Sequence, residues 1–322
     1  MKILLAAPQD SHSNLYLERA FKQLNHSVTQ FDYRNTNLNP TVALTNDHLK
    51  ELSQVHDLTL ILKGEVFTPE TLRSVHPCVL FNFDLWYSQE NWLHEQVKAV
   101  DHFLTPSKGV FQGDNVHYMV EAADLELHRP MPYDKEYAID VCFIGTVADI
   151  PGRDEWLERV GKWCDDNKKV LKIFGSFPGK KSDKWHQGRR AGEPLKDGRA
   201  DNLLAMNEDA MHNIIVSSSK VILDRQRNPE IEGAVSARVF RVLAAKGFLL
   251  MRHCEGQEDL LGLKNGVNCA TYRDDEECLA QISYYLSMPH KRMEIAERGY
   301  ADCLSKHTWK HRVESILTLV KK

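Results

Sequence analysis

One stretch of the chain shows the unit from which the whole protein is built. It reads Gly233-Ala-Val-Ser-Ala-Arg-Val-Phe-Arg-Val-Leu-Ala-Ala-Lys-Gly-Phe-Leu-Leu250. The spacing of its apolar residues predicts a helix over 237–245, which ends before the short apolar run 248–251. Such an uninterrupted apolar run is typical of a strand buried on both faces of a parallel sheet. The stretch therefore predicts one helix-to-strand unit of an α/β fold.

The same alternation continues in both directions from this stretch. Further helices are expected at 15–24, 156–163, 202–212, 276–287, 290–305 and 311–320. In the first half of the chain, apolar runs predict strands at 3–7, 27–33, 58–62, 79–83, 102–105 and 116–120. In the second half they predict strands at 140–144, 170–174, 221–223, 248–251 and 270–272, with a long polar loop at about 176–199. This βαβ rhythm predicts doubly wound, Rossmann-like domains.

The rhythm restarts after Arg129-Pro-Met-Pro132, where two prolines favour a linker. We therefore expect two domains, residues 1–131 and 132–322. A chain of 322 residues fits this division, because single domains rarely grow beyond roughly 250–300 residues. Open α/β sheets bind ligands at the carboxyl ends of their strands, so the two domains are expected to face each other across a cleft.

Composition excludes several classes of protein. The net charge of −4 argues against a molecule that binds nucleic acid over its whole surface, although a local basic patch stays open. The seven cysteines are scattered and form no CxxC pair, which predicts reduced thiols and neither disulfides nor zinc. We see no signal peptide and no apolar stretch long enough to span a membrane, and we expect a cytoplasmic protein. Neither a GxGxxG fingerprint nor a P-loop motif occurs, so hydride transfer and P-loop chemistry have no support.

Two segments in the second domain could approach a phosphate. Gly145-Thr146 follows an expected strand, and a helix N-terminus at that place offers free amide groups to an anion. Ser236 opens the helix of the quoted stretch, and Arg238 could bind a pyrophosphate through two hydrogen bonds. The plainer interpretations are an ordinary strand-to-helix turn and a solvated arginine on an amphipathic helix.

Several stretches, taken in order, resemble the CgeB-like glycosyltransferases, which have the GT-B architecture. They include Val79-Leu-Phe-Asn-Phe-Asp84, Asp140-Val-Cys-Phe-Ile-Gly-Thr146, Arg153, Ile173-Phe-Gly175, Ser219-Lys-Val-Ile-Leu-Asp224, Ser236-Ala-Arg-Val-Phe240 and His307-Thr-Trp-Lys-His-Arg312. The resemblance covers about two-thirds of the chain. It implies two Rossmann-like domains, with the C-terminal helix returning toward the N-terminal domain.

The resemblance also implies a function. The C-terminal domain would bind a nucleotide-sugar, here expected to be a UDP-sugar, with no metal and no further cofactor, and the acceptor would face the N-terminal domain. By motif, the residues carried over to the donor site are Gly145, Thr146, Arg153, Gly175, Lys220, Ser236 and Arg238. Lys220 could equally be a surface lysine at the start of its strand.

One position departs from the family pattern. A glutamate that would hold the ribose hydroxyls is expected after Phe240, and this chain has Arg241. A guanidinium cannot accept hydrogen bonds, so Glu258 or another acid would take this role, or Arg241 would add a phosphate contact. A non-catalytic protein that binds sugar nucleotides, or a structural protein of the spore-coat type, stays open as the rival interpretation.

In the N-terminal domain, Asp10 and His12 follow the first strand and Asp84 follows the fourth. An acid or histidine at such a place could serve as the general base for an acceptor hydroxyl, so these three are the catalytic candidates. His12 could also be an ordinary exposed loop histidine.

A basic segment lies in the polar loop of the second domain. Its side chains are those of Lys180, Lys181, Lys184, Trp185, Arg189 and Arg190. Basic residues with an aromatic among them can bind phosphates and stack a base. This segment raises the alternative that the acceptor is duplex DNA with hydroxymethylated bases, as for glycosyltransferases of bacterial viruses. A solvated loop is the plainer interpretation.

Overall fold

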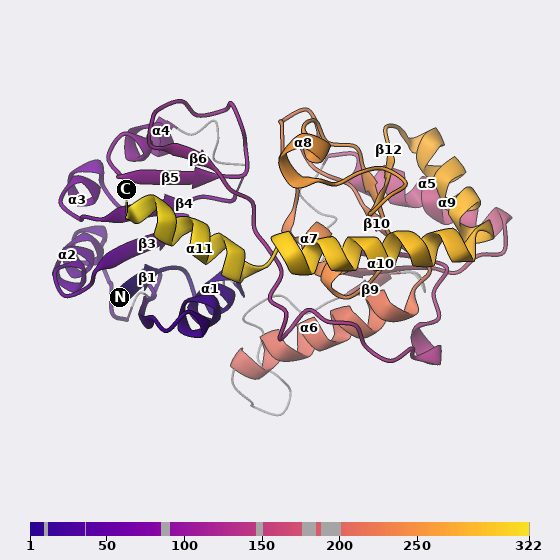
Figure 1. Cartoon of the computed structure of the whole chain (residues 1–322), viewed down its shortest axis with the longest axis horizontal. Coiled ribbons are helices and arrows are strands. Elements are labelled where there is room, and N and C mark those ends of the chain that lie inside the picture. Colours follow the sequence, from indigo (N-terminus) through magenta and orange to yellow (C-terminus); the bar gives the residue numbers. More distant parts are fainter. Residues whose placement is uncertain are drawn as a thin grey trace. The chain divides into compact units, whose positions relative to one another are not determined.

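The computed structural model describes residues 1–9, 12–35, 37–84, 91–145, 151–175, 185–187 and 201–321. These residues form two compact units, each built on a parallel sheet (Figure 1). Unit 1 consists of Met1–Ala122, Ile231–Ala234 and Trp309–Lys322, and unit 2 of Ala123–Glu230 and Val235–Thr308. The predicted α/β class, with two doubly wound sheets, is confirmed.

The sheet of unit 1 has the strand order β2-β1-β3-β4-β5-β6. Its strands are β1 (Lys2–Ala6), β2 (Ser27–Phe31), β3 (Leu58–Leu62), β4 (Cys78–Phe81), β5 (His102–Thr105) and β6 (Val116–Tyr118). Every residue of β3 and β4 is buried, as their mainly apolar sequences predict. The order reverses between β1 and β3, and this reversal is the point at which open sheets bind ligands.

Five helices belong to unit 1 in the described part of the chain. They are α1 (His12–Gln23), α2 (Val42–Ser53), α3 (Pro69–Arg73), α4 (Asn91–Val97) and α11 (Trp309–Val320). The last helix, yellow in Figure 1, is far from the others in sequence but is fixed to them by contacts. The ring centroid of Trp309 lies 6.4 Å from those of Tyr16 and Phe81, and Arg312 Nε donates to the carbonyl of Val120 at 2.8 Å.

The sheet of unit 2 has the strand order β12-β11-β10-β7-β8-β9. Its strands are β7 (Val141–Ile144), β8 (Leu171–Gly175), β9 (Trp185–Gln187), β10 (Val221–Asp224), β11 (Leu249–Arg252) and β12 (Ala270–Tyr272). The order reverses between β7 and β10. A buried cluster of Phe143, Trp156 and Tyr272 packs beside these strands, with the rings of Trp156 and Tyr272 stacked.

The helices of unit 2 are α5 (Arg153–Asp166), α6 (Asp201–Ser218), α7 (Ala237–Ala244), α8 (Gln257–Leu261), α9 (Asp275–Ser287) and α10 (Pro289–Lys306), with a 3-10 turn at Lys135–Tyr137. Among the described residues, no helix is both long and apolar enough to cross a bilayer.

Four helices and one strand were not expected from the sequence: α2, α3, α4, α8 and β9. Helix α2 buries only Thr45, Asn46 and Leu49, so its apolar periodicity is weak, and the Thr41 side chain caps it by accepting from the amide of Leu44. Helices α3 and α8 are too short to show a period. Strand β9 lies inside the predicted polar loop of 176–199, so that prediction is wrong at Trp185–Gln187.

Candidate functional site

A group of arginines lies at the carboxyl edge of the unit 2 sheet, where the strand order reverses. Asp224, the last residue of β10, is fully buried and forms an ion pair with Arg238 of α7. The guanidinium of Arg238 also lies over the ring of Phe143 in β7, 5.1 Å from its centroid. The Arg238 side chain keeps 17% of its surface exposed, so it can still be reached by a ligand.

The start of α7 is tied to the end of β10 by side chains. Ser236, the N-cap residue of α7, donates its amide to Gln226 Oε1 at 2.9 Å, and Gln226 Nε2 donates to Asp224. Helix α7 buries one face through Val239, Phe240, Val242 and Leu243. Since residues three apart lie on the same side of a helix, Arg238 and Arg241 share the other face.

Two glycines allow this edge to pack closely. A Cβ at Gly145, where φ is +154°, would lie 2.1 Å from Arg238 Nη2. A Cβ at Gly175, where φ is +146°, would lie 2.1 Å from the carbonyl oxygen of Gly145. The close approach that Gly145 permits in this structure is therefore to Arg238, whereas the sequence suggested an approach to phosphate.

Two more arginines extend the group. Arg153, at the start of α5, is buried and donates to the carbonyl of Arg225. Burial and the neighbouring charge of Arg238 lower the pKa of Arg153 to about 9. Arg225 donates to Asp275 at 2.6 Å and lies over the ring of Trp156. Three arginines thus surround two carboxylates, Asp224 and Asp275, and the arrangement favours an anion.

The other donor-site candidates lie apart from this group or outside the described residues. Lys220 directly precedes β10, at the amino edge of the sheet, and its ammonium lies 2.7 Å from Asp140. Glu258 is in α8, 59% exposed, and pairs with Lys264 at 3.2 Å. Arg241 is partly exposed in α7, and Thr146 is outside the described residues.

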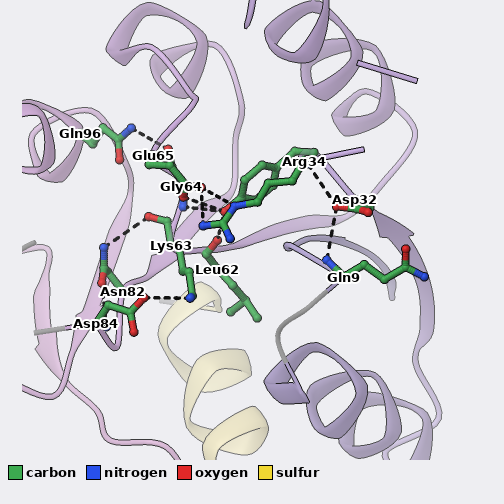
Figure 2. Close-up of polar contacts among 11 residues, drawn as sticks. Gln9, Asp32, Arg34, Leu62, Lys63, Gly64, Glu65, Asn82, Asp84 and Gln96 are labelled. Carbon is green, nitrogen blue, oxygen red and sulfur yellow. Dashed lines mark hydrogen bonds and ion pairs between the residues drawn. The ribbon is translucent and has the colours of Figure 1, made fainter. Parts of the chain in front are cut away.

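In unit 1, the carboxyl ends of four neighbouring strands carry a second charged group, shown in Figure 2. Lys63 Nζ lies 2.9 Å from Asp84, and Arg34 Nη2 lies 2.6 Å from Glu65. The carboxylate of Asp32 accepts from the amides of Gln9 and Arg34, at 3.3 and 3.1 Å. The catalytic candidate Asp84 is therefore already held by an ammonium group.

Of the other two catalytic candidates, His12 begins α1, with its ring edge-on to Tyr16 at 6.5 Å, and Asp10 lies outside the described residues. Most of the basic segment of unit 2 is also outside the described residues. Lys180, Lys181, Lys184, Arg189 and Arg190 are outside the described residues, and of Trp185 only its place in β9 is known. Within the described ranges, no group of three or more His, Cys, Asp or Glu side chains could hold a metal ion.

Sequence reasoning missed several members of both groups, namely Asp224, Arg225, Asp275, Asp32, Arg34, Lys63 and Glu65. A signal for some of them was present. Asp224 and Lys63 each follow a predicted strand, as Asp84 does, so the rule applied to Asp84 would also have found these two. Asp275 gave no such signal, because only the tertiary fold brings α9 to Arg225.

Two doubly wound parallel sheets, one of them with arginines gathered at its carboxyl edge, fit the GT-B class of glycosyltransferases. The family description "Glycosyl transferase-like" matches residues 153–318, which is more than half of the chain. The protein belongs to this family and is a glycosyltransferase.

Solved structures agree with this class. Sucrose-phosphate synthase from Thermosynechococcus elongatus is 11% identical, with a TM-score of 0.68 and coverage of 100% of this chain and 98% of that one. A glycosyltransferase from Rickettsia africae is 9% identical, with a TM-score of 0.63 and coverage of 99% and 97%. HepE of Anabaena, in complex with UDP, is 11% identical, with a TM-score of 0.60 and coverage of 99% and 100%. At these identities the likeness shows the fold alone. No curated protein matches the sequence.

Proposed function

We propose that this protein transfers a sugar from a UDP-sugar to an acceptor hydroxyl, with the donor held by unit 2. The observation that carries the proposal is the group of Arg153, Arg225 and Arg238 at the carboxyl edge of the sheet. Guanidinium groups bind phosphates through paired hydrogen bonds, and these hydrogen bonds are stronger at a partly buried site than in water. The similar structures of HepE, which contain UDP, support a uridine nucleotide as the donor part.

Arg238 is the residue best placed to contact the diphosphate. Its Nη1 binds Asp224, which fixes the guanidinium over Gly145 and leaves other donor atoms for a ligand. Positive charge at this place stabilises the negative charge that develops on the diphosphate as it leaves the sugar in the transition state. Because arginines supply this charge, we propose that the reaction needs no metal ion.

The acceptor contacts unit 1 in this proposal. In an inverting reaction a base must take the proton of the acceptor hydroxyl, and Asp84 and His12 are our candidates. Lys63 Nζ lies 2.9 Å from Asp84 Oδ2, and this ion pair holds the carboxylate at the carboxyl edge of the sheet. The more specific resemblance to CgeB-like enzymes, and a DNA acceptor bound by the basic segment, stay predictions from the sequence.

The test measures turnover with a panel of UDP-, GDP- and TDP-sugars, with and without EDTA. Release of the nucleoside diphosphate is the readout. We expect release from at least one UDP-sugar, unaffected by EDTA. Calorimetry with UDP separates the rival class: UDP binding without any release or transfer would identify a non-catalytic binding protein. Loss of activity in EDTA, restored by a divalent cation, would contradict metal independence.

A further inference from the structure

The charged group of unit 1 has a composition that discriminates between kinds of acceptor. We name it the β1–β4 edge group, consisting of Asp32, Arg34, Lys63, Glu65 and Asp84. It contains three carboxylates and two cations, and each cation is already ion-paired within the group, Arg34 with Glu65 and Lys63 with Asp84. A phosphate ester would have to compete with these carboxylates for the same two cations and would also meet the extra negative charge of the group.

The backbone beneath the group is held in a fixed conformation. Lys63 and Gly64 both have positive φ values, +66° and +81°. The buried Tyr33 hydroxyl accepts a hydrogen bond from the amide of Gly64 at 3.2 Å. It lies 2.8 Å from the carbonyl of Leu62 and 3.0 Å from Glu65 Oε2. Burial and the charge of Glu65 raise the pKa of Tyr33, so the hydroxyl stays protonated. The Glu65 carboxylate is therefore oriented from two sides, by Arg34 and by Tyr33.

A buried acceptor atom is left over at the same turn. Gln96 is 2% exposed, and its Nε2 donates to the carbonyls of Gly64 and Phe67 at 2.8 and 2.6 Å (Figure 2 shows the Gln96 side chain beside Gly64). Its Oε1 has no hydrogen-bond partner in the part of the chain that the structure describes. It would lie 3.6 Å from a Cβ at Gly64. A buried polar atom without a partner calls for an explanation such as a bound water.

We propose that the β1–β4 edge group binds a neutral carbohydrate, so that the acceptor is an uncharged sugar rather than a sugar phosphate or a nucleic acid. Sugar hydroxyls donate to oriented carboxylates such as Glu65 and Asp84 and accept from Lys63 and Arg34. These donors and acceptors therefore suit the alternating hydroxyls of a sugar, which carry no charge of their own. Phe83, partly exposed beside Lys63, adds an apolar surface of the kind on which sugar rings pack.

This inference rests on the proposed function only in giving the bound sugar the role of acceptor. Its test needs no donor. Saturation-transfer NMR of the full chain is recorded with glucose, galactose, N-acetylglucosamine and maltose, and with glucose 6-phosphate as the charged probe. We expect a neutral sugar to bind more tightly than glucose 6-phosphate. Glu65→Gln and Asp84→Asn should each weaken its binding about tenfold, the usual effect of losing a hydrogen bond to a charged group.

Glu95→Gln is the matched control, because this carboxylate is 56% exposed on α4 and pairs only with Lys98 among the salt bridges of the described residues. Asp84→Asn complements Glu65→Gln, since Glu65 also contacts Tyr33 and its loss could disturb the turn. Tighter binding of glucose 6-phosphate, binding of hydroxymethylated duplex DNA that Glu65→Gln weakens, no binding of any neutral sugar, or unchanged binding in both variants would overturn the proposal. UDP calorimetry on the same variants should be unchanged. If UDP does not bind the wild type, the proposed function fails independently of the sugar result.

Discussion

Arg238 occupies the space that a side chain at position 145 would need. Its Nη2 lies 2.1 Å from where a Cβ of Gly145 would stand, and its Nη1 is held by the buried Asp224. One packed arrangement therefore joins a glycine directly after β7, an aspartate at the end of β10 and an arginine in α7. The position of the arginine depends on the other two residues, and each can be tested separately.

Gly145→Ala should weaken UDP binding although it replaces no phosphate-binding side chain. The new methyl group must displace the guanidinium or force a backbone with φ of +154° to change, which costs about 1–3 kcal/mol. Calorimetry with UDP and thermal unfolding together measure the effect. Gly152→Ala is the control, because Gly152 also has a positive φ, +71°, but no atom of the described residues lies within 4 Å of its added Cβ. Equal UDP affinity of Gly145→Ala and wild type would mean that Arg238 is not positioned by this glycine.

Arg238→Ala should reduce UDP affinity by about 1.5–3 kcal/mol, the usual contribution of a hydrogen bond to a charged group. The control is Arg298→Ala, since Arg298 is 51% exposed on α10 and pairs only with Glu294 among the salt bridges of the described residues. Calorimetry at matched ionic strength separates the two. If both variants bind UDP as the wild type does, Arg238 does not contact the diphosphate.

Asp224→Asn should destabilise the fold. The change leaves Arg238 and the buried Arg153 without a fully buried carboxylate, and breaking a buried pair in this way costs about 3–5 kcal/mol. Urea unfolding gives the change in the free energy of unfolding. Asp166→Asn, whose carboxylate is 60% exposed in its pair with Lys162, should change that free energy by less than about 1 kcal/mol. A similarly small effect for Asp224→Asn would show that the arginines need no counter-charge.

Lys220→Ala should leave UDP affinity unchanged, as expected for a surface lysine and not for a donor-site residue. The lysine precedes β10 at the amino edge of the sheet, and its partner Asp140 precedes β7. Because the Lys220 side chain is 53% exposed, its loss should cost no more than about 1 kcal/mol of stability. A clear loss of UDP affinity would return Lys220 to the donor site and would contradict the placement of that site at the carboxyl edge.

The sequence alone determined the architecture. Short, mainly apolar runs such as Leu58–Leu62 are typical of strands buried on both faces, and their alternation with helical patterns leaves few topologies other than two doubly wound sheets. The pattern is local, so it can be read from neighbouring residues. It also marked Gly145, Ser236, Arg238 and Asp84, because each lies at the end of an element where parallel sheets place their ligands.

Only the tertiary structure decided which of these residues meet. Asp224 and Arg238 come together because β10 and α7 pack side by side, and Asp275 reaches Arg225 from a helix about fifty residues further along the chain. Lys220 and Arg238 likewise lie at opposite edges of the sheet, although both belong to motifs that resemble the family. Ion pairing and close approach depend on distances in space, and the apolar pattern that specifies the fold contains no information about which charged side chains those distances bring together.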